Sequence, residues 1–135
     1  MSKFSLSVLA AERLFYEGEC SSLIVPTLDG MYGIQANHCN MIGVVVPGSL
    51  KITTPNGEEI IAAVSEGFVK VEDNSVLILV DTAEYPEEID INHARHTLED
   101  AKEAMLQKKS IQDYHAAQAK LARAINRLKV KNEYK

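Results

Sequence analysis

The neighbours His38 and Cys39 are the point at which this sequence comes closest to a nucleophile beside a base. They lie in a segment, residues 29–48, that holds four glycines and a proline between two apolar stretches. Adjacent residues on a strand point to opposite faces and rarely form a catalytic pair. Two candidate ligands also fall short of the four that a structural zinc takes. We therefore expect a histidine at the rim of a β-sandwich beside a buried cysteine, with no catalytic residue and no metal site.

Three further histidines fall in a helical region. His93 and His96 are three residues apart and share a helix face, whereas His115 lies on a second helix. In a hairpin that turns near residue 110, His115 would lie about 15 Å along the axis from His96, at 1.5 Å per residue. That separation is too large for a shared metal, so we expect His96 and His115 to be solvated.

One basic stripe follows the second helix. It consists of Lys120, Arg123, Arg127 and Lys131, spaced 3, 4 and 4. Such a stripe can be a solvated face, partly neutralised by acidic residues across the hairpin, or it can hold phosphate or an acidic protein loop. In the same hairpin Arg123 lies level with Leu98 and Arg127 with Ala94, so both arginines converge on the first turns of the first helix.

Charge is divided unevenly along the 135 residues. Residues 1–86 carry 4 Lys/Arg and 11 Asp/Glu, whereas residues 87–135 carry 10 and 8, for a net charge of −5 overall. An acidic chain without an aromatic stacking platform is a poor nucleic-acid binder. No signal peptide and no bilayer-spanning apolar run is apparent, so we expect a soluble intracellular protein with two free, mostly buried thiols, Cys20 and Cys39.

The first part of the chain has a β pattern. Phe4, Leu6 and Val8 alternate with more polar residues, and Pro55–Gly57 and Asp73–Asn74 predict two hairpin turns. The run Val76–Val80 is apolar at every position, which predicts a strand buried between two layers. About ten short strands separated by turn residues favour an antiparallel β-sandwich.

After Tyr85–Pro86 the apolar period becomes helical. The first seam consists of Ile91, Ala94, Leu98, Ala101 and Met105, and the second of Tyr114, Ala117, Leu121, Ala124 and Leu128. Asp90 and Asp113 are the predicted N-caps, and Lys108–Ser110 is the predicted break. The fold class is therefore α+β in two segregated parts, a β-sandwich over 1–86 and an antiparallel two-helix hairpin over 87–135. Because four of the ten seam residues are Ala, we expect a marginal hairpin that can change its docking.

Over nearly its whole length, the chain resembles the epsilon subunit of bacterial rotary ATP synthases. The β pattern is carried by Gly30-x-x-Gly33-Ile34 with His38, by Val46-Pro47-Gly48-x-Leu50-x-Ile52, by Gly67-Phe68-Val69-x-Val71, and by Val76-x-Ile78-Leu79-Val80-Asp81-x-Ala83-Glu84. Ile89-Asp90 and Arg123-Ala124-x-Asn126-Arg127-Leu128 resemble the helical domain. Together these motifs are highly specific.

Three positions depart from the family pattern. Cys39-Asn40 stands where the family usually has Ala-Pro, and Glu66-Gly67 stands where it has Gly-Gly. We expect both changes to leave the fold intact. The nucleotide motif usually reads Ile/Leu-Asp-x-x-Arg-Ala, whereas this chain has His93 at the arginine position. Regulatory ATP binding is therefore expected to be weak.

The resemblance implies a non-catalytic rotor subunit. Its β-sandwich would couple the gamma shaft to the ion-conducting ring of c subunits, and its hairpin would restrain ATP hydrolysis by meeting the catalytic alpha and beta subunits. It would be peripheral on the cytoplasmic face of the bacterial plasma membrane, without inserting into the bilayer. No cofactor would be required. The alternatives are a free-standing nucleotide-sensing module and a small hydrolase that uses His38.

Two sets of site residues follow from the resemblance. The shaft and ring would be met by a corner that consists of Asp29, Gly30, Met31, Tyr32, His38, Asn40, Met41 and Ile42. ATP, as a weak regulatory ligand, would be surrounded by Glu84, Asp90, His93, Ala94, Arg123 and Arg127.

Overall fold

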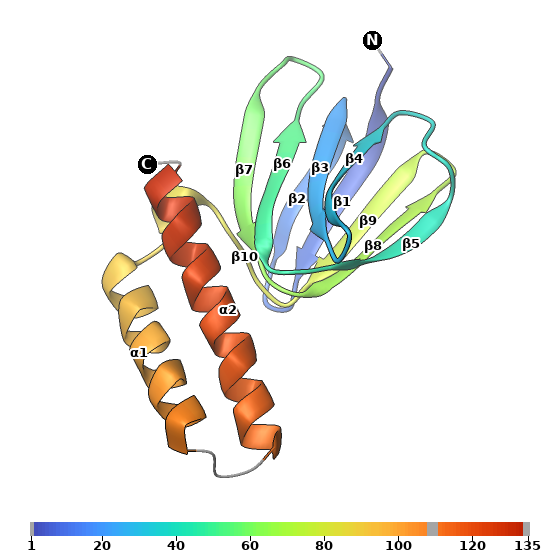
Figure 1. Ribbon diagram of the computed structural model, residues 1–135. Helices are drawn as coiled ribbons and strands as arrows, with labels where there is room; N and C mark the ends of the chain where they lie inside the picture. Colours follow the sequence, from blue (N-terminus) through green and yellow to red (C-terminus); the bar gives the residue numbers. More distant parts are fainter. Residues whose placement is uncertain (1, 108–110, 134–135) are drawn as a thin grey trace. The chain divides into compact units, whose positions relative to one another are not determined.

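The computed structural model describes the backbone of residues 2–107 and 111–133, and the side chains of residues 2–105 and 115–133. The chain forms two compact units, Met1–Tyr85 and Pro86–Lys135. The first unit is built of strands and the second of helices (Figure 1). The predicted break at Lys108–Ser110 lies outside the described residues, as does the side chain of Tyr114.

The first unit is a ten-stranded sheet folded onto itself as a sandwich. Its strands are β1 (Phe4–Ala10), β2 (Leu14–Cys20), β3 (Ser22–Thr27), β4 (Gly30–Gln35), β5 (Met41–Val45), β6 (Gly48–Thr53), β7 (Glu59–Val64), β8 (Gly67–Glu72), β9 (Ser75–Val80) and β10 (Ala83–Glu84). Their order is β10-β7-β6-β3-β5-β8-β9-β1-β2, and β4 pairs with β3. The predicted sandwich is confirmed with one correction, because β1 and β9 pair in parallel.

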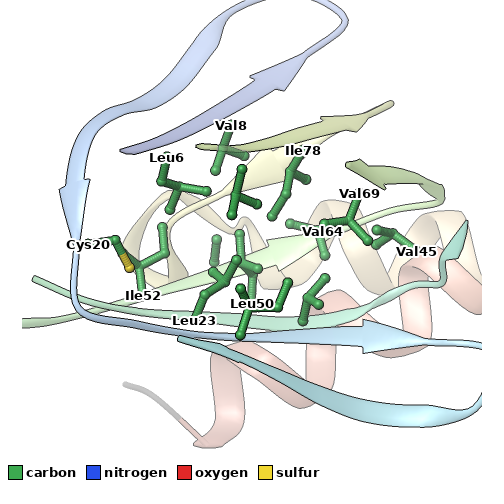
Figure 2. Close-up of a cluster of buried hydrophobic side chains, with 14 of the residues drawn as sticks. Leu6, Val8, Cys20, Leu23, Val45, Leu50, Ile52, Val64, Val69 and Ile78 are labelled. Carbon is green, nitrogen blue, oxygen red and sulfur yellow. The ribbon is translucent and has the colours of Figure 1, made fainter. Parts of the chain in front are cut away.

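Alternating side chains from both layers fill the core. Figure 2 shows Leu6, Val8 and Ile78 pointing into the interior that Leu23 and Leu50 also enter. All five side chains are at least 99% buried. Burying one such side chain contributes about 1.5–3 kcal/mol, so this period-2 pattern holds the strands in register.

Both predicted hairpin turns are confirmed. Residues 54–58 connect β6 to β7 with Gly57 at φ 87°, and Asp73 and Asn74 connect β8 to β9 with φ 49° and 62°. Two successive residues with positive φ match the right-handed twist of the flanking strands. Asp and Asn tolerate this conformation better than other residues that carry a Cβ.

Gly67 lies where two backbones approach closely. A Cβ at this position would fall on the carbonyl oxygen of Leu79 and lie 2.7 Å from the Cα of Val80. Only a residue without a side chain therefore lets β8 begin beside the end of β9.

Strand β9 departs from its prediction. Val76, Ile78 and Val80 are buried, but Leu79 is 44% exposed and Leu77 is half-buried. The strand is therefore covered on one face only, and the prediction of burial between two layers was wrong. An apolar run does not distinguish a second protein layer from a face left for another molecule.

The second unit is a pair of antiparallel helices (Figure 1). A short 3₁₀ turn, η1 (Pro86–Glu88), precedes α1 (Ile91–Gln107) and α2 (Ile111–Glu133). The predicted cap at Asp90 is confirmed, because its Oδ1 accepts a 3.1 Å hydrogen bond from the amide of His93. The prediction for Asp113 was wrong, since α2 begins two residues earlier.

The seam between the helices contains the predicted alanines. Ala94, Ala101, Ala117 and Ala124 are all buried, as is Val130. Small residues let the two helices approach closely but remove little apolar surface from water. The packing of this unit is accordingly weaker than that of the sandwich.

Candidate functional site

His38 lies in the loop between β4 and β5 and uses both of its ring nitrogens. Its Nδ1 is 2.8 Å from the carbonyl oxygen of Cys39, and its Nε2 is 2.8 Å from the hydroxyl of Tyr32. A carbonyl oxygen only accepts, so Nδ1 carries the proton and Nε2 accepts from the tyrosine. The Tyr32 and His38 rings also meet edge to face, with centroids 5.5 Å apart.

Cys39 differs from its prediction. It is exposed rather than buried, and because the pair lies in a loop rather than on a strand, its Sγ is 3.8 Å from Nδ1 of His38. This nitrogen is the one that already carries a proton and donates to a carbonyl. It cannot take the proton of the thiol in that state, so the geometry argues against a nucleophile and base.

The predicted corner is divided between the two ends of β4. Asp29, Gly30 and Met31 lie at the β3–β4 turn and are exposed, Met31 by 59%. His38 and Asn40 follow the other end of the strand, whose six residues make five steps of about 3.4 Å and so span about 17 Å. Tyr32 is the one predicted residue that joins them, through its hydrogen bond to His38.

An apolar row that the sequence did not reveal crosses the outer face of five strands. It consists of Val44, Phe68, Leu79, Leu9 and Leu14. Each residue is the direct cross-strand partner of the next, from β5 through β8, β9 and β1 to β2. Their exposed fractions run from 36% to 57%. At about 4.8 Å per strand the row is about 19 Å long.

The outer face becomes more polar away from this row. The next register line contains Ile42, which is 76% exposed, and Lys70. Glu72 lies two residues further along β8 on the same face, and it forms a 3.0 Å ion pair with Lys70. An apolar band with a polar border on one side is typical of a surface that contacts another protein. The corresponding signal in the sequence is the apolar run Val76–Val80, which predicts a strand buried between two layers and so hides the exposed face.

The helical unit contains all but one of the residues predicted to bind nucleotide. Asp90 and Ala94 are linked by a 2.9 Å backbone hydrogen bond, and Ala94 is buried. Arg123 and Arg127 lie one turn apart on α2 and are half-buried, while His93 is exposed. The remaining predicted residue, Glu84, belongs to the other unit.

A shallow pocket lies where the first turns of α1 meet the last turns of α2. It is lined by Ile91, Arg95, Leu128, Lys129 and Asn132. This contact agrees with the antiparallel hairpin expected from the sequence, in which the start of the first helix lies beside the end of the second. Two cationic side chains and an amide beside two apolar side chains could receive an anionic group, although none of the five residues belongs to the predicted nucleotide set.

The remaining histidines of this unit are solvated. His96 and His115 are both exposed, as predicted, and Nε2 of His96 lies 3.2 Å from the carboxylate of Asp100 one turn away. In the part of the chain that the structure describes, no group of three or more His, Cys, Asp or Glu side chains is placed to hold a metal. None of the described helical segments is both long and apolar enough to cross a membrane.

Comparison with protein families gives two adjoining matches. Residues 3–86 match the β-sandwich domain of the ATP synthase delta/epsilon chain, and residues 87–132 match its long α-helix domain. An ATP synthase epsilon chain of Ruminiclostridium cellulolyticum is 42% identical over 132 residues, which is 98% of each chain. One of Caldanaerobacter subterraneus is 40% identical, covering 97% of this chain and 95% of the relative.

Solved structures share the fold. A chain in the cryo-EM structure of Euglena gracilis mitochondrial ATP synthase (OSCP/F1/c-ring) gives a TM-score of 0.76 at 22% identity, covering 90% of this chain and 77% of that one. A chain in the Tetrahymena thermophila mitochondrial ATP synthase central stalk and c-ring gives 0.63 at 17% identity, covering 94% and 95%. The same succession of sandwich and helices therefore occurs at low sequence identity.

Proposed function

The chain belongs to the family of ATP synthase delta and epsilon chains, and from this membership we propose that it is a non-catalytic rotor subunit of the central stalk. It couples the gamma shaft to the ring of c subunits, peripherally at the cytoplasmic face of the bacterial plasma membrane. The observation that carries the coupling role is the apolar row. A side chain that is about half exposed on an isolated subunit can be covered by a neighbour.

The gamma subunit is the proposed partner of the apolar row. Phe68 and Leu79 lie at its centre and are directly opposite each other on β8 and β9. A central aromatic and aliphatic pair with a more polar border has the composition of an interface hot spot. Ile42, on the adjoining register line, extends the apolar surface toward the loop of His38.

The two ends of β4 are the proposed contacts with the c ring. Met31 supplies exposed, adaptable apolar area at one end, and the loop of residues 36–40 presents polar side chains at the other. The Tyr32–His38 hydrogen bond supports this role, because it holds the loop to the strand that carries Met31.

The hairpin is the proposed regulatory part. Its seam of alanines is weakly packed, which suits a unit that changes position, and Arg123 and Arg127 offer charge to acidic loops of the alpha and beta subunits. ATP is at most a weak ligand of Glu84, Asp90, His93, Ala94, Arg123 and Arg127. No cofactor is needed for the coupling role.

Binding of this chain to purified gamma subunit tests the proposal. Leu79→Lys places a charge at the centre of the apolar row, whereas Ser75→Lys places the same charge at the polar end of the same face of β9. We expect binding to gamma to weaken at least tenfold with Leu79→Lys and to stay within about twofold with Ser75→Lys, since a charge costs most in the desolvated centre of an interface.

Circular dichroism of both variants checks that they fold. Equal weakening by both substitutions would assign gamma binding to another surface. Absence of binding by the unsubstituted chain, together with tight ATP binding by the chain alone, would favour the nucleotide-sensing module instead.

A further inference from the structure

Two asparagines hold the loop of residues 36–40 against a distant hairpin turn. The Oδ1 of Asn74, in the β8–β9 turn, accepts a 2.7 Å hydrogen bond from the amide of Asn37. In return, Oδ1 of Asn40 accepts a 3.0 Å bond from the amide of Asp73 in that turn. Each segment therefore supplies one side-chain acceptor to one backbone amide of the other.

The turn is itself tied to the start of the chain. Nδ2 of Asn74 donates a 3.0 Å hydrogen bond to the carbonyl oxygen of Lys3. The backbone carbonyl oxygen of Asn74 accepts a 3.3 Å hydrogen bond from the amide of Ser5. Asn74 thus joins three segments that are far apart in the sequence. Its carboxamide is suited to this because it has an acceptor and a donor on one rigid group.

Backbone conformation favours asparagine in these places. Asn37 and Asn74 have φ of 63° and 62°, in the left-handed region. Among residues with a Cβ, Asn and Asp enter this region most readily. A glycine could adopt the same backbone but would supply neither the acceptor nor the donor. The combination of positive φ with a bridging carboxamide therefore selects Asn at position 74.

The loop fixed in this way carries His38. Since His38 is bonded to Tyr32 on one side and to the Cys39 carbonyl on the other, its position depends on where residues 37–40 are held. We infer that Asn74 and Asn40, named here the asparagine clamp, are positioning residues that pre-order this loop for the c ring. This inference rests on the proposed function. Pre-ordering lowers the entropy that the loop loses when it binds.

The test compares three variants of the full chain in binding to gamma subunit and to purified c ring. Asn74→Gly keeps the turn backbone but removes the carboxamide. Asn40→Ala removes the other acceptor. Asn74→Asp keeps the acceptor for the Asn37 amide and loses the donor to Lys3. We expect Asn74→Gly and Asn40→Ala to bind the ring at least fivefold more weakly with unchanged gamma binding, and Asn74→Asp to stay within about twofold of the parent.

Hydrogen exchange of the isolated chain gives a second readout. The Asn37 amide should exchange at least tenfold faster in Asn74→Gly, and the Asp73 amide faster in Asn40→Ala. Asn56→Gly, in the exposed β6–β7 turn, is the matched control and should change neither binding nor these amides.

Several results would overturn the clamp's role. Parental ring binding by Asn74→Gly would do so, as would equal losses of ring and gamma binding, which would indicate general destabilisation. Equal weakening of ring binding by Asn74→Asp and Asn74→Gly would also count against the clamp, because Asn74→Asp keeps the acceptor for the Asn37 amide. If the parent chain itself bound neither gamma nor ring, the proposed function would fail first.

Discussion

The guanidinium of Arg13 donates a 2.9 Å hydrogen bond to the carbonyl oxygen of Ala83. Arg13 directly precedes β2 and Ala83 begins β10, so this bond joins the two ends of the strand order. The guanidinium carbon also lies 5.4 Å from the ring centroid of Phe15 and 6.0 Å from that of Tyr85, and the two rings are 4.5 Å apart. Tyr85, the last residue of the sandwich, is thereby anchored within it.

Replacing Arg13 should destabilise the sandwich. Arg13→Ala removes a hydrogen bond from a charged donor and two cation–π contacts, for an expected loss of about 1–3 kcal/mol in the free energy of unfolding. Lys51→Ala is the control, because Lys51 forms an exposed 3.3 Å ion pair with Glu59 that should contribute less than about 1 kcal/mol. Urea unfolding of both variants measures the difference. Equal stabilities would contradict the anchoring role of Arg13.

Gly67→Ala should be poorly tolerated. The new methyl group would collide with backbone atoms of Leu79 and Val80, which cannot rotate away as a side chain can. Overpacking of this kind costs about 1–3 kcal/mol or more. The matched control is Gly33→Ala, because a Cβ at Gly33 meets no atom within 4 Å. Thermal unfolding followed by circular dichroism should show a clear drop in Tm for the first variant alone, and similar values for both would be inconsistent with the close approach.

The two thiols should react at very different rates. Cys39 is exposed, whereas Cys20 is fully buried and donates to the carbonyl of Ser22 at 2.9 Å. Burial raises the pKa of the Cys20 thiol, so it stays protonated and unreactive in the folded chain. A disulfide-exchange reagent at pH 8 should modify one thiol quickly and the second only on unfolding. Rapid modification of both would contradict the burial of Cys20.

The same raised pKa makes stability depend on alkaline pH. Above about pH 8.5, where an unfolded cysteine ionises, the unfolded state has lost a proton that the folded state keeps. Stability should therefore fall as pH rises from about 8.5 to the pKa of the folded thiol. Cys20→Ala should reduce this slope in urea unfolding at pH 7 to 10. A slope equal to that of the parent chain would assign the effect to another group.

Local patterns in the sequence predicted most of the fold. The alternation of Phe4, Leu6 and Val8, the positive-φ turn at Asp73–Asn74 and the cap at Asp90 each depend on a few neighbouring residues. The fold class was accordingly correct, and the errors concern helix and strand details such as Asp113 and the parallel pairing of β1 with β9.

The surfaces could not be predicted in the same way. Val44 and Leu14 belong to one row only because the registers of five strands align them. The bond between Asn37 and Asn74 joins residues 37 positions apart, and nothing local at either residue specifies the other. Register and distant polar contacts are set by the packed sheet, so the family resemblance could indicate the corner at residues 29–42 but not its division by β4.

The basic stripe of the hairpin gives a prediction for the assembled enzyme. If Arg123 and Arg127 meet acidic loops of the catalytic subunits, their joint replacement by Ala should raise ATP hydrolysis, because it weakens a restraint. Each exposed ion pair contributes about 1 kcal/mol or less and is screened by salt. Hydrolysis should therefore rise most clearly at low ionic strength. Rates equal to the parent at both low and high salt would assign the stripe to a solvated face.

ATP binding by the chain alone should be weak because of His93. Arginine is charged at every physiological pH and can hold a polar partner with two donors, whereas histidine is shorter and carries a charge only in acid. Asp90 already caps the amide of residue 93, so the backbone of this turn is set in the same way for either side chain. The substitution therefore tests the side chain rather than the helix start.

Calorimetric titration with ATP at pH 6 and pH 8 measures this effect. The parent should bind weakly or undetectably at pH 8 and better at pH 6, and His93→Arg should gain about ten- to a hundredfold, the equivalent of one charge-assisted hydrogen bond of about 1.5–3 kcal/mol. Arg123→Ala in the His93→Arg background should remove the gain if both side chains face one ligand. Tight binding that ignores both pH and the substitution would mean that ATP is held elsewhere, or that the histidine acts by stacking on the ligand.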